Sequence, residues 1–179
     1  MRLFTTIALD KEVKEYLCEL QKKIGRNLAK INYISKKNLH LTLKFLGEVD
    51  KDKLTEIKKA LRKIKYKKFK LKIDKIGVFS NEYSINVIWA GVENESKISE
   101  LQTKVDEETI NLSKEGIKLG GHITLGRIKT IKNREIFLKR IKEIKFEVLE
   151  FEVNEFKLIK SSLNKNGPDY EVIDIYSLE

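Results

Sequence analysis

The only two histidines of this 179-residue chain stand in the same four-residue pattern, His-x-Thr-x with a hydrophobic residue at each x. The first copy is HLTL at 40–43 and the second is HITL at 122–125. Because side chains alternate between the two faces of a β-strand, each copy predicts a strand with its His and Thr on one face and its hydrophobic neighbours in the core. Helical hydrophobic spacing precedes and follows both copies, so the pattern indicates an internal repeat.

We therefore expect one α+β domain over residues 1–179, made of two pseudo-twofold-related α/β lobes with antiparallel sheets lining a central cleft. Each lobe supplies one motif, His40 to Leu43 in the first and His122 to Leu125 in the second. Hydrophobic spacing leaves open whether strands cross between the lobes.

The same spacing predicts the individual elements. Strands are expected at 2–9, 38–47, 69–79, 84–92, 121–130, 145–160 and 170–178, with a turn at Ser80, Asn81 and Glu82. Four helices are expected: one opened by Asp10 with Val13, Leu17, Leu20 and Ile24 inward; one with Leu54, Ile57, Leu61 and Ile64 inward; one with Ile98, Leu101, Val105 and Leu112 inward, ending near Gly116; and one at 133–144 with Ile136, Ile141 and Ile144 inward.

Composition excludes several classes of protein. The single cysteine, Cys18, rules out an internal disulfide, and no CxxC pair or histidine cluster predicts a metal site. No apolar run is long enough to cross a membrane, and the first residues predict a short strand rather than a signal peptide. We expect a cytoplasmic monomer with no cofactor, no metal, no membrane contact and no obligate protein partner.

Positive charge is concentrated in one segment. Residues 51–72 hold eleven Lys or Arg residues against Asp52 and Glu56, within a chain of net charge +10. Clustered cations attract polyanions such as RNA, because phosphates are neutralised and counterions released on binding. The alternative is an ordinary solvated helix face, and the composition does not decide between the two.

Two histidine–threonine pairs facing one cleft would suit displacement at phosphorus. In-line displacement needs a base on the attacking oxygen and an acid on the leaving oxygen, and two imidazoles can fill both roles near neutral pH. Hydroxyl groups of Thr42 and Thr124 could donate hydrogen bonds to the non-bridging phosphate oxygens. This scheme requires no metal. One His-x-Thr alone would more simply be an ordinary half-buried strand, but two matching copies favour a site built on His40 and His122.

At these residues the sequence resembles the two-histidine phosphoesterase superfamily. More narrowly, the segments HLTLKFLGEV, VIWAGV, HITLGRIK and SSLNKNGPDY, together with the starting RLFTTIALD, resemble the RNA 2′,3′-cyclic phosphodiesterases, which are also called 2′-5′ RNA ligases. The resemblance extends over essentially the whole chain. It implies a bilobal α+β fold and metal-independent hydrolysis of a terminal RNA 2′,3′-cyclic phosphate to a 2′-phosphate.

The resemblance also implies residue roles. His40 would be the acid that protonates the departing 3′ oxygen, and His122 the base that activates water. Thr42 and Thr124 would hold phosphate oxygens, Arg127 would bind phosphate, and Phe45 would contact a base. The near-symmetric pattern by itself does not order the two histidines.

Strand parity conflicts with two of these roles. Strict alternation puts Phe45 and Arg127 on the face opposite their histidines, so each needs a bulge, a strand end or a long reach to enter the cleft. Lys44 has the parity of His40 and Thr42, and is either a cleft cation or a solvated lysine. Gly120 and Gly121 replace the bulkier residue or proline of relatives, and are expected to loosen the placement of His122.

The expected function is RNA-end cyclic phosphodiesterase, with tRNA among the candidate substrates. Three alternatives remain open from the sequence: a 2′-5′ ligase joining tRNA halves, a phosphodiesterase acting on small cyclic nucleotides, and a non-catalytic RNA-binding module.

Overall fold

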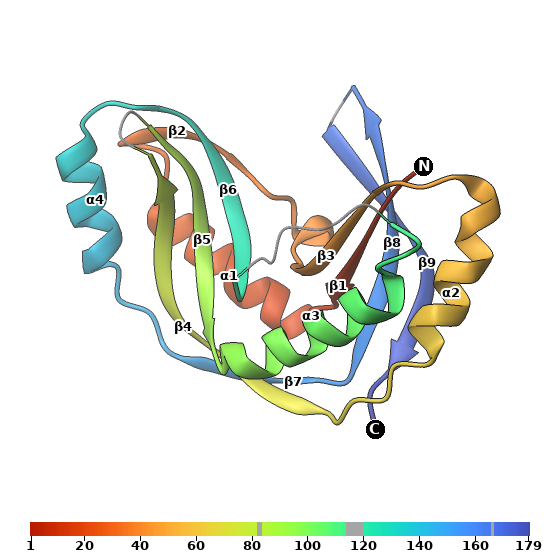
Figure 1. The fold of residues 1–179 in the computed structure, drawn as a ribbon. Helices are drawn as coiled ribbons and strands as arrows, with labels where there is room; N and C mark the ends of the chain where they lie inside the picture. The colour runs from red at the N-terminus through yellow and green to blue at the C-terminus, as the bar shows by residue number, and fades with distance from the viewer. Residues whose placement is uncertain (82–83, 114–119, 166) are drawn as a thin grey trace.

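The computed structural model describes residues 1–81, 84–113, 120–165 and 167–179, and its described strands form one curled sheet (Figure 1). Every strand pairing recorded among these residues is antiparallel. The strands are β1 (Arg2–Ile7), β2 (Ala29–Tyr33), β3 (Leu41–Glu48), β4 (Phe69–Ser80), β5 (Ile85–Glu93), β6 (His122–Ile131), β7 (Leu149–Val153), β8 (Glu155–Asn164) and β9 (Gly167–Ser177).

Helices pack beside this sheet, and the first and fourth begin at residues whose side chains cap them, Asp10 and Asn133. Asp10 caps the first helix as expected, since its carboxylate accepts a hydrogen bond from the Val13 N–H at 2.8 Å. Figure 1 shows the third helix below β3, and the first helix passing behind β5 and β6. The α-helices are α1 (Lys11–Ile24), α2 (Leu54–Arg62), α3 (Glu95–Thr109) and α4 (Arg134–Glu143), with short 3-10 turns at Lys36–Asn38 and Lys51–Lys53.

The two motif strands meet at the centre of the sheet. The strand order is β7-β4-β5-β6-β3-β1-β8-β9, and β2 pairs with β6. Leu41 of β3 lies opposite Ile123 of β6, at the junction. Outward from this junction, β1, β8 and β9 follow on one side, and β5, β4 and β7 follow on the other. The bilobal α+β fold expected from the repeat is therefore confirmed, within one continuous sheet.

Strands do cross between the two halves. The early strand β2 pairs with β6, and Ile34 N–H continues along the same edge to the Leu125 carbonyl at 2.9 Å. The late strands β8 and β9 extend the sheet from β1. Hydrophobic spacing missed β2, because five residues with only Ala29 and Ile31 fully buried are too short to establish a period.

Two helix predictions are wrong in detail. Helix α4 buries Phe137 and Ile141, one turn apart, so Ile136 is rotated by about 100° away from the core and is 52% exposed. Helix α3 ends at Thr109, earlier than expected, and Leu112 packs on the core from the turn that follows it. The expected helix end near Gly116 lies outside the described residues.

The boundaries of the expected strands agree to within three residues, except in the range 145–160. That range was expected as one strand, but β7 begins only at Leu149, Asn154 separates it from β8, and β8 continues to Asn164. Part of the expected turn, Glu82, lies outside the described residues.

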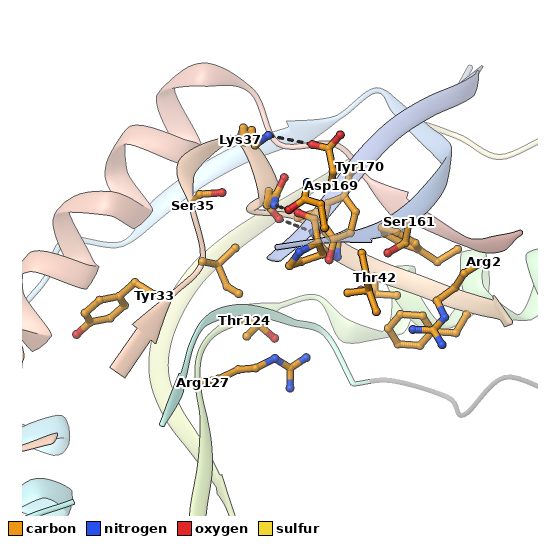
Figure 2. A pocket seen from close by; sticks show the side chains of 18 of the residues that line it. Arg2, Tyr33, Ser35, Lys37, Thr42, Thr124, Arg127, Ser161, Asp169 and Tyr170 are labelled. Atoms are coloured by element: carbon orange, nitrogen blue, oxygen red, sulfur yellow. Dashed lines mark hydrogen bonds and ion pairs between the residues drawn. The ribbon is translucent and has the colours of Figure 1, made fainter. Parts of the chain in front are cut away.

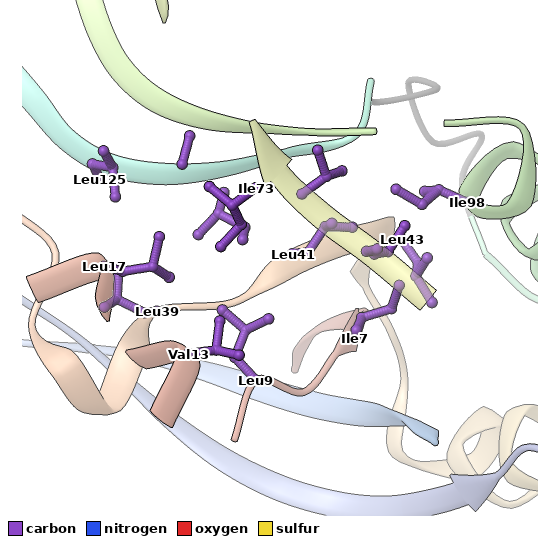
Figure 3. Close-up of a cluster of buried hydrophobic side chains, with 14 of the residues drawn as sticks. Ile7, Leu9, Val13, Leu17, Leu39, Leu41, Leu43, Ile73, Ile98 and Leu125 are labelled. Carbon is purple, nitrogen blue, oxygen red and sulfur yellow. The ribbon is translucent and has the colours of Figure 1, made fainter. Parts of the chain in front are cut away.

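The hydrophobic residues of both motifs enter one shared core. Leu41, Leu43, Ile123 and Leu125 have 0–1% of their surface exposed. Figure 3 shows Leu41, Leu43 and Leu125 among side chains from α1 and neighbouring strands. Each His-x-Thr is therefore attached to the core by the residues between and after its polar groups.

Candidate active site

One cavity of about 640 Å³ is lined by residues from both halves of the sheet. Its walls come from β1, β2, β3 and β6, the 3-10 turn before β3, and the β8–β9 hairpin (Figure 2). All six site residues named from the sequence line this cavity: His40, Thr42, Phe45, His122, Thr124 and Arg127. Residues separated by more than 80 positions in the chain thus share one chamber.

The two motifs meet at one recorded pair of residues, Leu41 and Ile123. Each of these hydrophobic residues stands between the His and the Thr of its own motif. Because the two strands run antiparallel, the histidine of each motif lies on the same side of this pair as the threonine of the other. A phosphate bound between β3 and β6 would lie within reach of both pairs.

Both imidazoles are held by the same backbone contact. His40 Nδ1 lies 2.6 Å from the Asn38 carbonyl oxygen, and His122 Nδ1 lies 2.9 Å from the Gly120 carbonyl oxygen. A carbonyl oxygen only accepts, so Nδ1 carries the proton in each ring. Nε2 is then the nitrogen of each ring that can gain or lose a proton.

Burial favours the neutral form of both histidines. Loss of solvent lowers the pKa of His40 below 6.5, its contact with the Asn38 carbonyl opposes this, and the charges of Lys14 and His122 lower the pKa further. Loss of solvent also lowers the pKa of His122, against the opposing effect of the Gly120 carbonyl. The influence of His122 on His40 reflects the proximity of the two rings.

A one-residue bulge in each motif strand resolves the parity conflict. In β3, Thr42 pairs with Thr6 while Lys44 pairs with Thr5, which leaves Leu43 as the extra residue. In β6, Thr124 pairs with Trp89 while Gly126 pairs with Ile88, which leaves Leu125 as the extra residue. Each bulge shifts the alternation by one position.

The shifted alternation decides which side chains enter the cavity. Phe45 and Arg127 are both exposed and both line it. Lys44 is turned to the other face and is only 3% exposed. Both sequence-based interpretations of Lys44, as a cleft cation and as a solvated lysine, are therefore wrong.

Lys44 instead joins β3 to α3. Its Nζ lies 2.6 Å from the Asp106 carboxylate and donates to the Thr109 hydroxyl at 3.0 Å. A buried ammonium with two partners is a structural contact, because desolvating the charge is costly unless it is paired and hydrogen-bonded.

Aromatic rings enclose each histidine, and sequence spacing did not identify them. The Phe4 and Tyr170 ring centroids lie 5.1 and 5.4 Å from that of His40. The Phe79 ring stands perpendicular to His122 at 4.8 Å. These residues reach the histidines only through the pairing of β1, β4 and β9 within the sheet. Of the three, only Phe4 and Tyr170 lie in segments that carried a signal, through the family resemblance.

Gly121 lies in a tight position beside His122. A Cβ there would be 2.8 Å from Ile98 Cδ1 and 3.0 Å from Val92 Cγ2, whereas a Cβ at Gly120 would meet nothing within 4 Å. The Val92 N–H also donates to the Gly121 carbonyl at 3.3 Å. The approach to His122 is packed and hydrogen-bonded, which argues against the loose placement expected from the two glycines.

The basic segment 51–72 lies outside the cavity wall. Several of its cations contact acidic groups from distant segments: Lys58 and Arg62 with Asp174, Lys63 with Glu108, Lys65 with Glu179, and Lys70 and Lys72 with Glu150. These pairs favour the solvated, charge-balanced interpretation of the segment. The cationic side chains on the cavity wall are Arg2, Lys37 and Arg127.

Within the described residues, no group of three or more His, Cys, Asp or Glu side chains is arranged to hold a metal ion. Among these residues no helix combines the length and apolar character needed to cross a membrane.

Comparison with known proteins identifies the family. The family model for LigT-like phosphoesterases matches residues 7–89. A Methanocaldococcus jannaschii protein named RNA 2′,3′-cyclic phosphodiesterase is 41% identical over 97% of this chain and 98% of its own length. A Thermotoga maritima protein of the same name is 35% identical over 97% of this chain and 93% of its own length.

Solved structures share the fold. A Thermus thermophilus crystal structure superposes with a TM-score of 0.78 at 28% identity, covering 99% of this chain and 97% of that one. Escherichia coli LigT in its apo form gives a TM-score of 0.78 at 23% identity over 99% of this chain and 96% of its own. With its doubled His-x-Thr motif in one cavity, the chain belongs to the LigT-like two-histidine phosphoesterases, the family of the proteins named RNA 2′,3′-cyclic phosphodiesterase.

Proposed function

We propose that this protein hydrolyses the 2′,3′-cyclic phosphate at the end of an RNA to a 2′-phosphate, without a metal ion. The observation that carries the proposal is the convergence of His40, Thr42, His122 and Thr124 on one cavity, with both imidazoles held through Nδ1. Two relatives that match this chain over nearly their whole length are named RNA 2′,3′-cyclic phosphodiesterase, and this supports an RNA end as the substrate.

The reaction follows from these positions. His122 Nε2 accepts a proton from water as the water oxygen attacks phosphorus, and the bond from phosphorus to O3′ breaks. Protonated His40 delivers its Nε2 proton to O3′, which leaves a 2′-phosphate and a 3′-hydroxyl. The order of the two histidines comes from the family resemblance, since the site itself is nearly symmetric.

The remaining groups would stabilise the charge that grows on the phosphate. Thr42 and Thr124 would donate hydrogen bonds to the non-bridging oxygens, and Arg127 would add a positive charge at the same group. Phe45, which is 47% exposed in the cavity, would stack on the terminal base.

The test is incubation of the purified protein with an RNA ending in a 2′,3′-cyclic phosphate, followed by identification of the product. We expect a 2′-phosphate, unchanged rates in EDTA, and a loss of about 10²-fold or more in kcat for His40→Ala and for His122→Ala. A 3′-phosphate product would show that O2′, and not O3′, is the leaving group. Tight RNA binding without turnover at any pH would leave the protein as a binding module.

A further inference from the structure

A polar row of side chains lies on the cavity wall beyond the residues of the two motifs. Arg2 of β1 lies opposite Ser161 of β8, and Ser161 lies opposite Tyr170 of β9. Residues opposite one another on paired antiparallel strands share a face of the sheet. All three line the cavity, so a guanidinium and two hydroxyl groups are presented together.

The register fixes where this row stands relative to the catalytic motif. Along β1, Thr6 lies opposite Thr42, Phe4 lies opposite Phe45, and Arg2 follows two residues further on. The Cα atoms of Arg2 and Thr6 are about 13 Å apart at the usual rise of a strand. The wall therefore presents, in order, the threonine that faces the reacting phosphate, a pair of aromatic rings, and an arginine.

Figure 2 agrees with this order. Arg2 and Ser161 lie on the side of Thr42 away from Thr124 and Arg127. The two arginines of the cavity thus lie on opposite sides of Thr42, so Arg2 would not share the phosphate proposed for Arg127.

The order of groups matches the 3′ end of an RNA. From the cyclic phosphate, the chain continues through the ribose and base of the last nucleotide to the phosphate on its 5′ side. We propose that Arg2, assisted by the Ser161 hydroxyl, binds this 5′ phosphate while Phe45 contacts the last base. The proposal rests on the proposed function and specifies how the same site would tell an RNA end from a free cyclic mononucleotide, which lacks that phosphate.

The positive charge of Arg2 is not held by a strong ion pair and can bind such a phosphate. Its Nε lies 3.6 Å from Glu48, in a pair whose side chains are 56% and 66% exposed. Ion pairs as exposed as this one contribute little and are readily exchanged for another anion. A guanidinium also binds phosphate through two hydrogen bonds at once, which a carboxylate at 3.6 Å from Nε alone does not reproduce.

The experiment compares two mononucleotide substrates, a nucleoside 2′,3′-cyclic phosphate with a 5′-hydroxyl and the same compound with a 5′-phosphate, beside a short RNA with a cyclic end. For the wild-type protein we expect kcat/KM to be about 10-fold higher with the 5′-phosphate than with the 5′-hydroxyl, as a charged hydrogen-bonded contact would give. In Arg2→Gln this ratio should fall to about one, with the 5′-hydroxyl compound unaffected.

Matched variants separate binding from folding and from net charge. Arg62→Gln removes the same charge from α2, outside the cavity, and should keep the wild-type ratio. Arg2→Lys should restore part of it, and Ser161→Ala should lower it less than Arg2→Gln. With the short RNA, Arg2→Gln should also reduce the salt slope of log kcat/KM by about 0.7, the value for one phosphate contact on a single strand.

An unchanged ratio in Arg2→Gln, or an equal loss on all three substrates, would overturn the assignment of Arg2. Both results leave the wild-type activity intact, so they differ from failure of the proposed function, in which the wild-type protein would hydrolyse none of the three.

Discussion

Phe45 and Arg127 occupy equivalent places in the two halves of the sheet, each five residues after its histidine and each turned into the cavity by a bulge two residues earlier. The two halves thus use one backbone device to present two different side chains. An aromatic ring stands on the His40 side and a guanidinium on the His122 side.

The placement of Arg127 predicts that its guanidinium binds the phosphate, and that a lysine at this position would bind it less well. Arg127→Gln should lower kcat/KM for the cyclic-phosphate RNA by about 10- to 100-fold, and Arg127→Lys by less, because one ammonium cannot reproduce the two-pronged contact of a guanidinium. Lys129→Gln, an exposed cation of the same strand, serves as the control. Equal rates for Arg127→Gln and the control would remove Arg127 from the site.

The shifted pKa values of the histidines predict an acid-shifted pH profile. The base must be neutral and the acid protonated, and burial lowers the pKa of both His40 and His122 below 6.5. The acid form of His40 is therefore lost at a lower pH than for a free imidazole. We expect a bell-shaped profile of kcat/KM with its maximum below pH 6.5, measured on the short RNA.

Mutation of Lys14 tests which limb of the pH profile belongs to His40. Its positive charge lowers the pKa of His40, so Lys14→Gln should move the alkaline limb to higher pH while leaving the acidic limb of His122 in place. Lys11→Gln, at an exposed position of the same helix, should move neither limb. Movement of the acidic limb instead would reverse the assignment of acid and base.

The ion pair of Lys44 predicts an asymmetric response to mutation. Asp106→Ala leaves a 4%-exposed ammonium without its carboxylate and should cost about 3 kcal/mol of unfolding free energy. Lys44→Met fills the same space with an apolar chain, while Asp106, 41% exposed, can be solvated, so this change should be nearly neutral. Urea unfolding of both variants and of the double variant checks the difference; equal losses in the two single variants would contradict it.

The two glycines before His122 provide a matched pair. Gly121→Ala forces Ile98 and Val92 to shift and should destabilise the protein by about 1–3 kcal/mol, with a further loss of activity if His122 moves. Gly120→Ala meets open space and should change the stability by less than about 0.5 kcal/mol. Thermal unfolding combined with the rate assay tests both, and equal melting temperatures for the two variants would contradict the close packing at residue 121.

Much of the site could be predicted from the sequence, because its four central residues lie in two short segments. His40, Thr42, His122 and Thr124 each lie two residues from their partner, so alternation alone predicted a shared face, and the hydrophobic residues beside them predicted attachment to the core. The repeat of the pattern predicted two related halves. Phe45 and Arg127 could be named only through resemblance to a family, against the parity of their strands.

Tertiary structure decided the rest. Leu43 and Leu125 are bulged because of how β3 pairs with β1 and β6 with β5, and no local pattern reveals such a pairing. In β3, the extra residue Leu43 turns the Lys44 side chain to the core and the Phe45 side chain to the cavity. Arg2 joins the site because β1 pairs with β3, and Tyr170 joins it because β8 and β9, late in the chain, add to the edge of β1. The sequence by itself determined which groups share a strand face, since this depends on the alternation of side chains along one strand. Which strands lie side by side depends on contacts between distant segments, and those contacts determined the remaining residues of the cavity.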